Sequence, residues 1–255
     1  MQAVSPAICQ IISQLQNIPS LSEFALGGGT NLALQFNHRV SEDIDLFCPN
    51  IVGKQGFKTI EEEVKKVFGK SVRNFDDPCD INDQFCFIRF FIDTPEGETI
   101  KVELLQNMKN LYDIEVKDTI RLLSKKDIGL FKLTSASNRT AKKDIYDLDF
   151  ITDEISLIEL FEELKIKTLK FNKEEDRTIF DLNKNQSPIE FPELLLQFDK
   201  STTSRNLPMH SHDNISIIEG NKTWIESKIS WRSKVRRLFS HLGKDFPGPI
   251  GIKIK

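Results

Sequence analysis

The sequence has 255 residues, enough for one large domain or two small ones with a sizeable buried core. Hydrophobic residues make up 39% of it and charged residues 29%, which is ordinary for a globular protein. No apolar run is long enough to cross a bilayer, and the N-terminus lacks the basic and apolar regions of a secretory signal. We therefore expect a cytoplasmic protein with no membrane segment. The four cysteines show no CxxC spacing, which argues against a zinc site.

The net charge of −3 conceals an uneven distribution along the chain. From Gly220 to Lys255 there are nine Lys or Arg residues and two acidic residues, so this segment carries +7 and the preceding part −10. A basic tail on an acidic body suggests a separate task for the tail, such as binding an anionic partner.

The N-terminal part alternates helical and extended patterns. Apolar spacing predicts a helix over about 5–17 and a short strand at 24–26 that enters a glycine turn. Thr30 is then a candidate N-cap for a second helix. Alternation of polar and apolar residues predicts a strand over 43–47, and residues 57–68 have the spacing of another helix.

A nearly continuous apolar run at 85–92 is typical of a strand buried on both faces. The turn that follows predicts that 99–105 returns as its hairpin partner. After about residue 115 the pattern becomes helical, beginning with a capping-box-like pair, Ser124 and Asp127. Further helices are predicted at about 141–150, 156–164 and 222–242, with loops over 183–215 broken by a short helix at 192–198.

We therefore expect an α+β protein: a small mixed-sheet core at 1–115 and a mostly helical domain with a basic C-terminal helix at 116–255.

Two aspartates on one strand are the first candidate for chemistry. Asp43 and Asp45 are two residues apart, so both side chains project from the same face of the predicted strand. Their repulsion is costly unless a cation lies between them, and Mg²⁺ accepts one or two protein carboxylates together with phosphate oxygens and waters. Glu103, polar between apolar neighbours on the predicted hairpin strand, is a candidate third carboxylate. The competing interpretation of such a pair is a solvated strand edge.

The glycine turn is the second candidate. Gly27, Gly28 and Gly29 can take positive φ and let backbone N–H groups approach phosphate oxygens, and the helix that follows adds its positive N-terminal end. The turn has neither the lysine of a P-loop nor the spacing of a dinucleotide-binding fingerprint. Arg39 either binds phosphate or pairs with Glu42 or Asp43. His38 is interpreted as a packing or turn residue.

Together these residues resemble the nucleotidyltransferase superfamily of DNA polymerase beta, whose signature places a glycine pair about a dozen residues before Asp-x-Asp. Here 13 residues separate Gly28-Gly29 from Asp43-Ile44-Asp45. The arrangement His38-Arg39-x-Ser41-x-Asp43 more narrowly resembles the AbiEii/AbiGii abortive-infection toxin family.

That family has a second cluster, a lysine on a helix followed by Arg and then Lys/Arg-Asp-x-x-Asp-Leu. This chain has Lys132, Arg139 and the run Lys143 to Leu148. The resemblance implies that Lys132 contacts the triphosphate and that Asp144 helps to orient the site. Without the resemblance, such a run is as often a solvated helix face.

The resemblance implies a nucleotidyltransferase that moves a nucleoside monophosphate from an NTP to a hydroxyl acceptor. Mg²⁺ or Mn²⁺ would be held by Asp43, Asp45 and Glu103, and the nucleotide would be bound by Gly28, Gly29, Thr30, Arg39 and Lys132. It also implies a toxin with a separately encoded antitoxin, acting on tRNA or another RNA. The alternatives are an antibiotic-type, small-molecule nucleotidyltransferase and a non-catalytic nucleotide- or RNA-binding module.

The basic C-terminal helix offers two interpretations. Arg232, Lys234, Arg236 and Arg237 can neutralise phosphates, and a neighbouring tryptophan such as Trp231 can stack on an unpaired base. Alternatively, the basic residues are solvated and the helical spacing of four apolar residues makes them an inner packing face, namely Trp224, Trp231, Val235 and Leu238.

Overall fold

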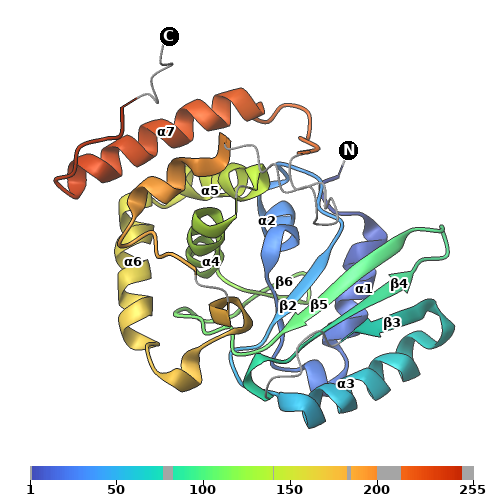
Figure 1. Cartoon of the computed structure of the whole chain (residues 1–255). Coiled ribbons are helices and arrows are strands. Elements are labelled where there is room, and N and C mark those ends of the chain that lie inside the picture. The colour runs from blue at the N-terminus through green and yellow to red at the C-terminus, as the bar shows by residue number, and fades with distance from the viewer. Residues whose placement is uncertain (1, 77–82, 140, 183–184, 200–213, 249–255) are drawn as a thin grey trace, which may run out of the picture. The chain divides into compact units, whose positions relative to one another are not determined.

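The computed structural model describes residues 2–76, 83–139, 141–182, 185–199 and 214–248 (Figure 1). The chain divides into two compact units built from interleaved segments. Unit 1 consists of Met1–Ile128, Lys167–Asn185 and Ser216–Asn221, and unit 2 of Gly129–Ile166, Gln186–Ile215 and Lys222–Lys255. We had expected a single boundary near residue 115. Stretches from the second half of the chain instead pack within unit 1.

Unit 1 is built on a mixed sheet with strand order β3-β4-β5-β2-β1-β7-β6 in the part of the chain that the structure describes. The strands are β1 (Ala25–Leu26), β2 (Ile44–Phe47), β3 (Val72–Asp76), β4 (Phe87–Asp93), β5 (Thr99–Leu105), β6 (Glu115–Lys117) and β7 (Ile120–Leu122). The β2–β5 and β1–β7 pairs are parallel and the others antiparallel. This mixed architecture confirms the expected α+β class.

Helices pack on one face of this sheet. They are α1 (Pro6–Gln16), α2 (Gly28–Phe36) and α3 (Gly53–Phe68). The Ser5 hydroxyl caps α1 by accepting from the Ile8 amide, and Pro6 fits the first helical turn because that turn needs no N–H donor. Apolar side chains of α1 and α3 share one core with the inward side chains of the central strands. Short 3₁₀ helices lie at Pro19–Leu21, Gly69–Ser71, Asp83–Phe85, Glu174–Asp176, Ile179–Leu182 and Pro192–Asp199.

The strand at 87–93 is covered on one face only. In β4 the residues Ile88, Phe90 and Ile92 are buried, while the alternate residues are half-buried. The prediction of a strand buried on both faces was therefore wrong, because the phenylalanines at alternate positions obscure the period of two. The predicted hairpin is confirmed, with β4 and β5 paired from Phe87↔Leu105 to Asp93↔Thr99.

One hairpin was missed at the point where only helices were expected. Strands β6 and β7 are three residues each, too short for a periodicity signal, and join through Asp118 and Thr119, both with positive φ. Strand β7 pairs with β1 at Leu26↔Leu122 and so belongs to the sheet of unit 1.

Four longer helices complete the described chain: α4 (Lys125–Asn138), α5 (Lys142–Glu154), α6 (Leu157–Lys170) and α7 (Trp224–His241). The predicted start of α4 is confirmed, since the Ser124 hydroxyl accepts from the Asp127 amide at 3.0 Å. The predicted loops of 183–215 lie partly outside the described residues. None of the helices within the described ranges is both long and apolar enough to span a membrane.

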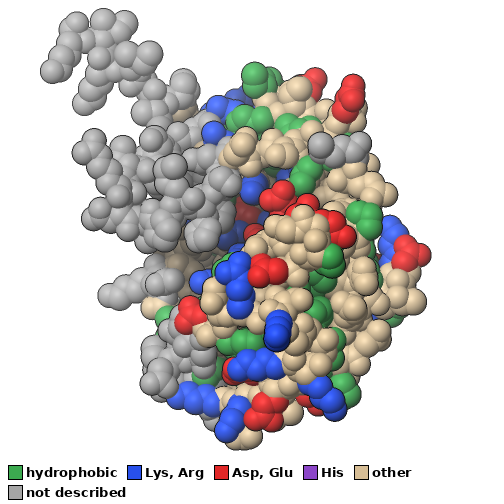
Figure 2. Space-filling model, turned by 90° about the vertical axis from the view of Figure 1, so that its right-hand side faces the viewer, with side chains coloured by type: hydrophobic (Ala, Val, Ile, Leu, Met, Phe, Trp, Pro, Cys, Tyr) green, Lys and Arg blue, Asp and Glu red, His purple; other side chains and the backbone are tan. Residues whose placement is uncertain are grey.

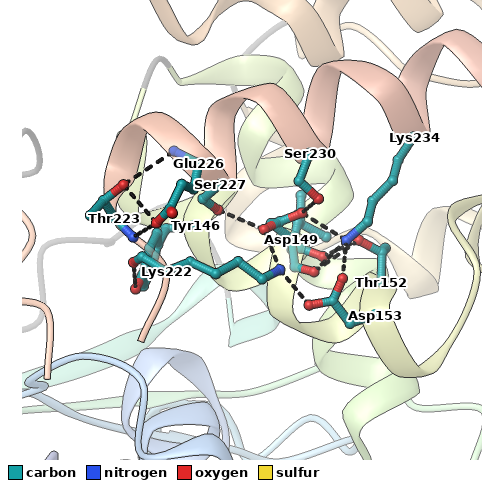
Figure 3. Close-up of polar contacts among 11 residues, drawn as sticks. Tyr146, Asp149, Thr152, Asp153, Lys222, Thr223, Glu226, Ser227, Ser230 and Lys234 are labelled. Atoms are coloured by element: carbon teal, nitrogen blue, oxygen red, sulfur yellow. Dashed lines mark hydrogen bonds and ion pairs between the residues drawn. The ribbon is translucent and has the colours of Figure 1, made fainter. Parts of the chain in front are cut away.

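Within unit 2, a buried aspartate joins α5 to α7 (Figure 3). Asp149 accepts from the Ser227 hydroxyl at 2.8 Å, and both Lys222 and Lys234 reach it with Nζ at 2.7 Å. Both lysines also pair with Asp153, one turn further along α5. These contacts satisfy the Asp149 carboxylate and orient α7 along α5.

We expect Asp149→Asn to lower the free energy of unfolding at pH 7 by about 3 kcal/mol, because it leaves two ammonium groups beside an uncharged amide. Chemical denaturation followed by tryptophan fluorescence measures the change. Asp153→Asn is the matched control, since Asp153 faces the same lysines but is 43% exposed, and it should cost less than about 1 kcal/mol. Equal losses would contradict a special role for Asp149.

The same network makes this stabilisation sensitive to acid. Burial raises the pKa of Asp149, but hydrogen bonds from Lys222 and Lys234 outweigh it and hold the pKa below its ordinary value. The stabilisation is thus complete above the unfolded-state pKa of about 3.9 and is lost as the pH falls through the folded-state pKa. The difference in stability between wild type and Asp149→Asn should shrink below about pH 4.

Candidate functional site

The aspartate pair lies at the start of β2. Ile44 and Leu46 are buried in the core, so Asp45 between them projects from the opposite face of the sheet. Asp43 directly precedes the strand, and its side chain is 57% exposed. The alternation of β2 therefore directs both carboxylates to the face that α1 and α3 do not cover.

Parallel pairing with β5 adds two more charged residues to this face. Ile44 lies opposite Val102 and Asp45 opposite Glu103. Lys101, two residues before Glu103, projects from the same face, and its Nζ lies 2.8 Å from Glu103 Oε2 and 3.5 Å from Asp43 Oδ2. An ammonium group thus bridges the first aspartate and the glutamate.

Glu103 is also held from its other side. Arg89 on β4 donates to Glu103 Oε1 from Nε at 2.8 Å and from Nη2 at 2.7 Å. Burial raises the pKa of Glu103, but the Lys101 and Arg89 charges outweigh it, so the pKa lies below its ordinary value. Across the residues that the structure describes, no three His, Cys, Asp or Glu side chains are grouped as a metal site. Glu103 lies beside the aspartate pair, as expected, because it is the register partner of Asp45, and its oxygens contact Arg89 and Lys101.

The glycine turn makes a close contact with the second aspartate. Helix α2 begins at Gly28, which has φ +60°, and a Cβ added there would lie 2.1 Å from Asp45 Oδ2. A Cβ on Gly29 would lie 2.3 Å from the Arg39 guanidinium. Positive φ and the closeness of Asp45 therefore both favour glycine at position 28, and the Asp45 carboxylate lies at the positive end of a helix.

Thr30 has a different role from the predicted one. The N-cap of α2 is Gly27, and Thr30 lies inside the helix. Its hydroxyl donates to the Asp43 carbonyl and shares a hydrogen bond of 2.9 Å with the Ser41 hydroxyl. Thr30 is buried, and it fixes the segment that leads into the aspartate pair.

The His38-Arg39 segment is also buried. His38 packs edge-on against Phe36, with ring centroids 5.7 Å apart. Arg39 donates to the Val40 carbonyl at 3.1 Å and forms an isolated β-bridge with Ile217. The Arg39 guanidinium therefore lies beside Gly29 with its backbone anchored by a distant part of the chain.

The second predicted cluster assembles within unit 2. Lys132 Nζ lies 2.7 Å from Asp144 Oδ1 and 2.8 Å from Asp147 Oδ2, and all three side chains are buried. Arg139 binds Asp144 from the other side at 2.6 Å. Burial raises the pKa of Asp144, but Lys132 and Arg139 outweigh it and lower the pKa. The run Lys-Asp-x-x-Asp is thus a buried ionic cluster rather than a solvated face.

The residues of the basic helix α7 differ in burial from one side of the helix to the other. Trp231 is buried, and its indole N–H donates to the Leu195 carbonyl, so it is a packing residue and not a surface for base stacking. Lys234 forms ion pairs with Asp149 and Asp153. Arg232, Arg236 and Arg237 are exposed. On the face of the molecule drawn in Figure 2, basic and acidic side chains are interspersed among the described residues.

Sequence patterns named most of these residues but missed three partners. Lys101 could have been found from its position two residues before Glu103, and Asp147 from its place in the Lys-Asp-x-x-Asp run. Arg89 lies inside the apolar run at 85–92, where no pattern along the segment indicates its partner. The predicted residues fall into two groups, one within unit 1 around Asp43 and Asp45 and one within unit 2 around Lys132.

Comparisons with known proteins show what this chain is similar to. The family model described as nucleotidyl transferase AbiEii toxin, type IV toxin–antitoxin system, matches residues 10–214. A solved structure of MenT4, a nucleotidyltransferase toxin from Mycobacterium tuberculosis H37Rv, is 15% identical and covers 94% of this chain and 83% of its own, with a TM-score of 0.53. That likeness shows the fold.

A solved aminoglycoside 6-adenyltransferase from Bacillus subtilis is 12% identical over 93% of this chain and 92% of its own, but its TM-score is 0.23. No curated protein matches the sequence. The family match identifies the chain as a nucleotidyltransferase. The chain belongs to the AbiEii toxin family, whose model spans most of its length.

We expect Gly28→Ala to destabilise the protein by about 2–4 kcal/mol, because the new methyl group must displace Asp45 and also adopt positive φ. Chemical denaturation measures the loss. Gly97→Ala is the matched control: Gly97 has φ +89° but no atom within 4 Å of an added Cβ, so only the backbone cost applies. If both variants lose the same free energy, the Gly28–Asp45 contact is not a constraint.

Proposed function

We propose that this AbiEii-family toxin transfers a nucleoside monophosphate from an NTP to a hydroxyl group of RNA, with tRNA as the first candidate acceptor. The observation that carries the proposal is the contact of Asp45 with Gly28, which combines one carboxylate of the Asp-x-Asp pair with the N-terminus of α2. Metal ligand and phosphate-binding turn therefore meet at one point of unit 1.

Asp43 and Asp45 would hold a divalent cation, Mg²⁺ or Mn²⁺. Two carboxylates on one face fit the donor set of Mg²⁺, which usually keeps several waters and phosphate oxygens as its other ligands. The Lys101 ammonium beside Asp43 is evidence that this face accommodates a cation. When bound, the metal ion would supply charge stabilisation to the attacking hydroxyl and the leaving pyrophosphate.

Within unit 1, the nucleotide would be bound by the glycine turn and Arg39. Gly28 and Gly29 offer backbone N–H groups at the start of α2, and the Arg39 guanidinium lies beside Gly29. Lys132 is proposed to contact the triphosphate and Asp144 to orient it, since Asp144 already holds the Lys132 ammonium. Thr30 contributes through the Asp43 segment that it fixes.

An RNA acceptor is supported by the exposed arginines of α7. Arg232, Arg236 and Arg237 project from unit 2 and can neutralise phosphates. Lys234 would contribute less, because Asp149 and Asp153 already neutralise it. The type IV toxin–antitoxin description of the family implies a separately encoded antitoxin, and we propose that both act in the cytoplasm.

We expect Asp45→Asn to reduce the transfer of labelled nucleotide to RNA by at least about 100-fold, because the amide cannot replace a charged metal ligand. The assay incubates the protein with each labelled NTP, Mg²⁺ and total RNA. Asp93→Asn is the control, since Asp93 is a half-exposed aspartate of the same sheet, paired with Arg73. Label on a small molecule instead of RNA would favour an antibiotic-type enzyme, and no NTP binding would favour a non-catalytic module.

We expect Arg232→Gln and Arg237→Gln each to weaken RNA binding and to lower the slope of log affinity against log salt by about one, because each removes one phosphate contact. Fluorescence anisotropy with labelled tRNA from 50 to 200 mM salt measures both quantities. Lys58→Gln removes an exposed charge from α3 and should change neither. An unchanged slope in both arginine variants would rule out α7 as the RNA-binding surface.

A further inference from the structure

Lys101 lies among the carboxylates of the aspartate face, and the proposed reaction gives it no role of its own. Its ammonium lies 2.8 Å from Glu103 and 3.5 Å from Asp43, and its side chain is 23% exposed. A fixed positive charge therefore lies among the carboxylates of β2 and β5.

The charge balance of this face limits how many metal ions it can take. Asp43, Asp45 and Glu103 contribute three negative charges, and Lys101 and Arg89 contribute two positive ones. One divalent cation reverses the net charge from −1 to +1. A second would raise it to +3 and would lie close to the Lys101 ammonium, which is unfavourable on a partly buried surface.

The contacts of Glu103 also argue against a second metal ion at this face. Arg89 donates two hydrogen bonds to Glu103 Oε1, and Lys101 donates one to Oε2. Both carboxylate oxygens are therefore already bound to cationic side chains. Arg89 and Lys101 approach from β4 and β5, whose pairing sets Arg89 directly opposite Glu103. A metal ion would have to replace two ion pairs to gain Glu103 as a ligand.

We propose that Lys101 is a positioning residue whose ammonium serves as the built-in cation of this face, so that the site takes one divalent ion, held by Asp43 and Asp45, with Glu103 as the anchor of Lys101. This inference rests on the proposed nucleotidyl transfer and assigns the metal stoichiometry of its site. Lys101 acts through Asp43, which it holds in the absence of a metal ion.

Mn²⁺ binding to the full chain tests the proposal, measured by calorimetry and by the electron paramagnetic resonance of free Mn²⁺, with and without a non-hydrolysable NTP analogue. We expect one site in the wild type, lost in Asp45→Asn. Lys101→Met should bind Mn²⁺ about tenfold more tightly or gain a second site, because a competing charge is removed. Lys101→Arg, which keeps the charge, and Lys58→Met on α3 should both match the wild type.

Glu103→Gln provides a test that does not depend on the folding of Lys101→Met. Glu103 is proposed to anchor Lys101 and not to bind the metal ion. The loss of Mn²⁺ affinity caused by Glu103→Gln should therefore be at least about tenfold smaller than the loss caused by Asp45→Asn. Two Mn²⁺ ions in the wild type, a Lys101→Met variant with neither tighter binding nor a second site, or equal losses in Glu103→Gln and Asp45→Asn would each overturn this inference alone. No Mn²⁺ binding to the wild type would overturn the proposed metal site as well.

Discussion

The parallel pairing of β2 with β5 is the constraint on which the candidate site depends. The register that opposes Ile44 to Val102 and Asp45 to Glu103 buries the apolar residues of both strands on the helix-covered face. Every charged residue between them is thereby placed on the other face. A slip of one residue would bury the carboxylates and expose the core, so hydrophobic burial and the placement of the site are enforced by the same register. The packing of the sheet and its chemistry cannot vary independently.

Close packing limits the glycine turn in the same way. A Cβ added at Gly28 would lie 2.1 Å from Asp45 Oδ2, and one added at Gly29 would lie 2.3 Å from the end of the Arg39 side chain. The glycine pair is thus explained by space as well as by phosphate binding. These two explanations are compatible, because the absence of side chains that admits Asp45 also leaves the first N–H groups of α2 accessible to an anion.

Many charged side chains of this protein are paired with one another in ion-pair networks rather than exposed as charged surface patches. Lys132 and Arg139 hold Asp144, Lys222 and Lys234 hold Asp149, and Arg89 and Lys101 hold Glu103. The excess of positive charge counted from the sequence of the tail is reduced by the two lysines that Asp149 binds. The positive charge that remains available to another molecule is carried mainly by the exposed arginines of α7.

Local sequence patterns were sufficient to predict the elements with strong signals, namely the long helices, the β4–β5 hairpin and the cap at Ser124. They also determined the family, because a glycine pair, Asp-x-Asp and their spacing form a local pattern. Only the tertiary structure decided the partners of Glu103, Lys132 and Lys234, the cap at Gly27, the β6–β7 hairpin and the interleaved units. Those features depend on contacts between residues that are far apart in the chain. The periodicity and residue spacing of one segment do not show which distant charge or strand will lie beside that segment.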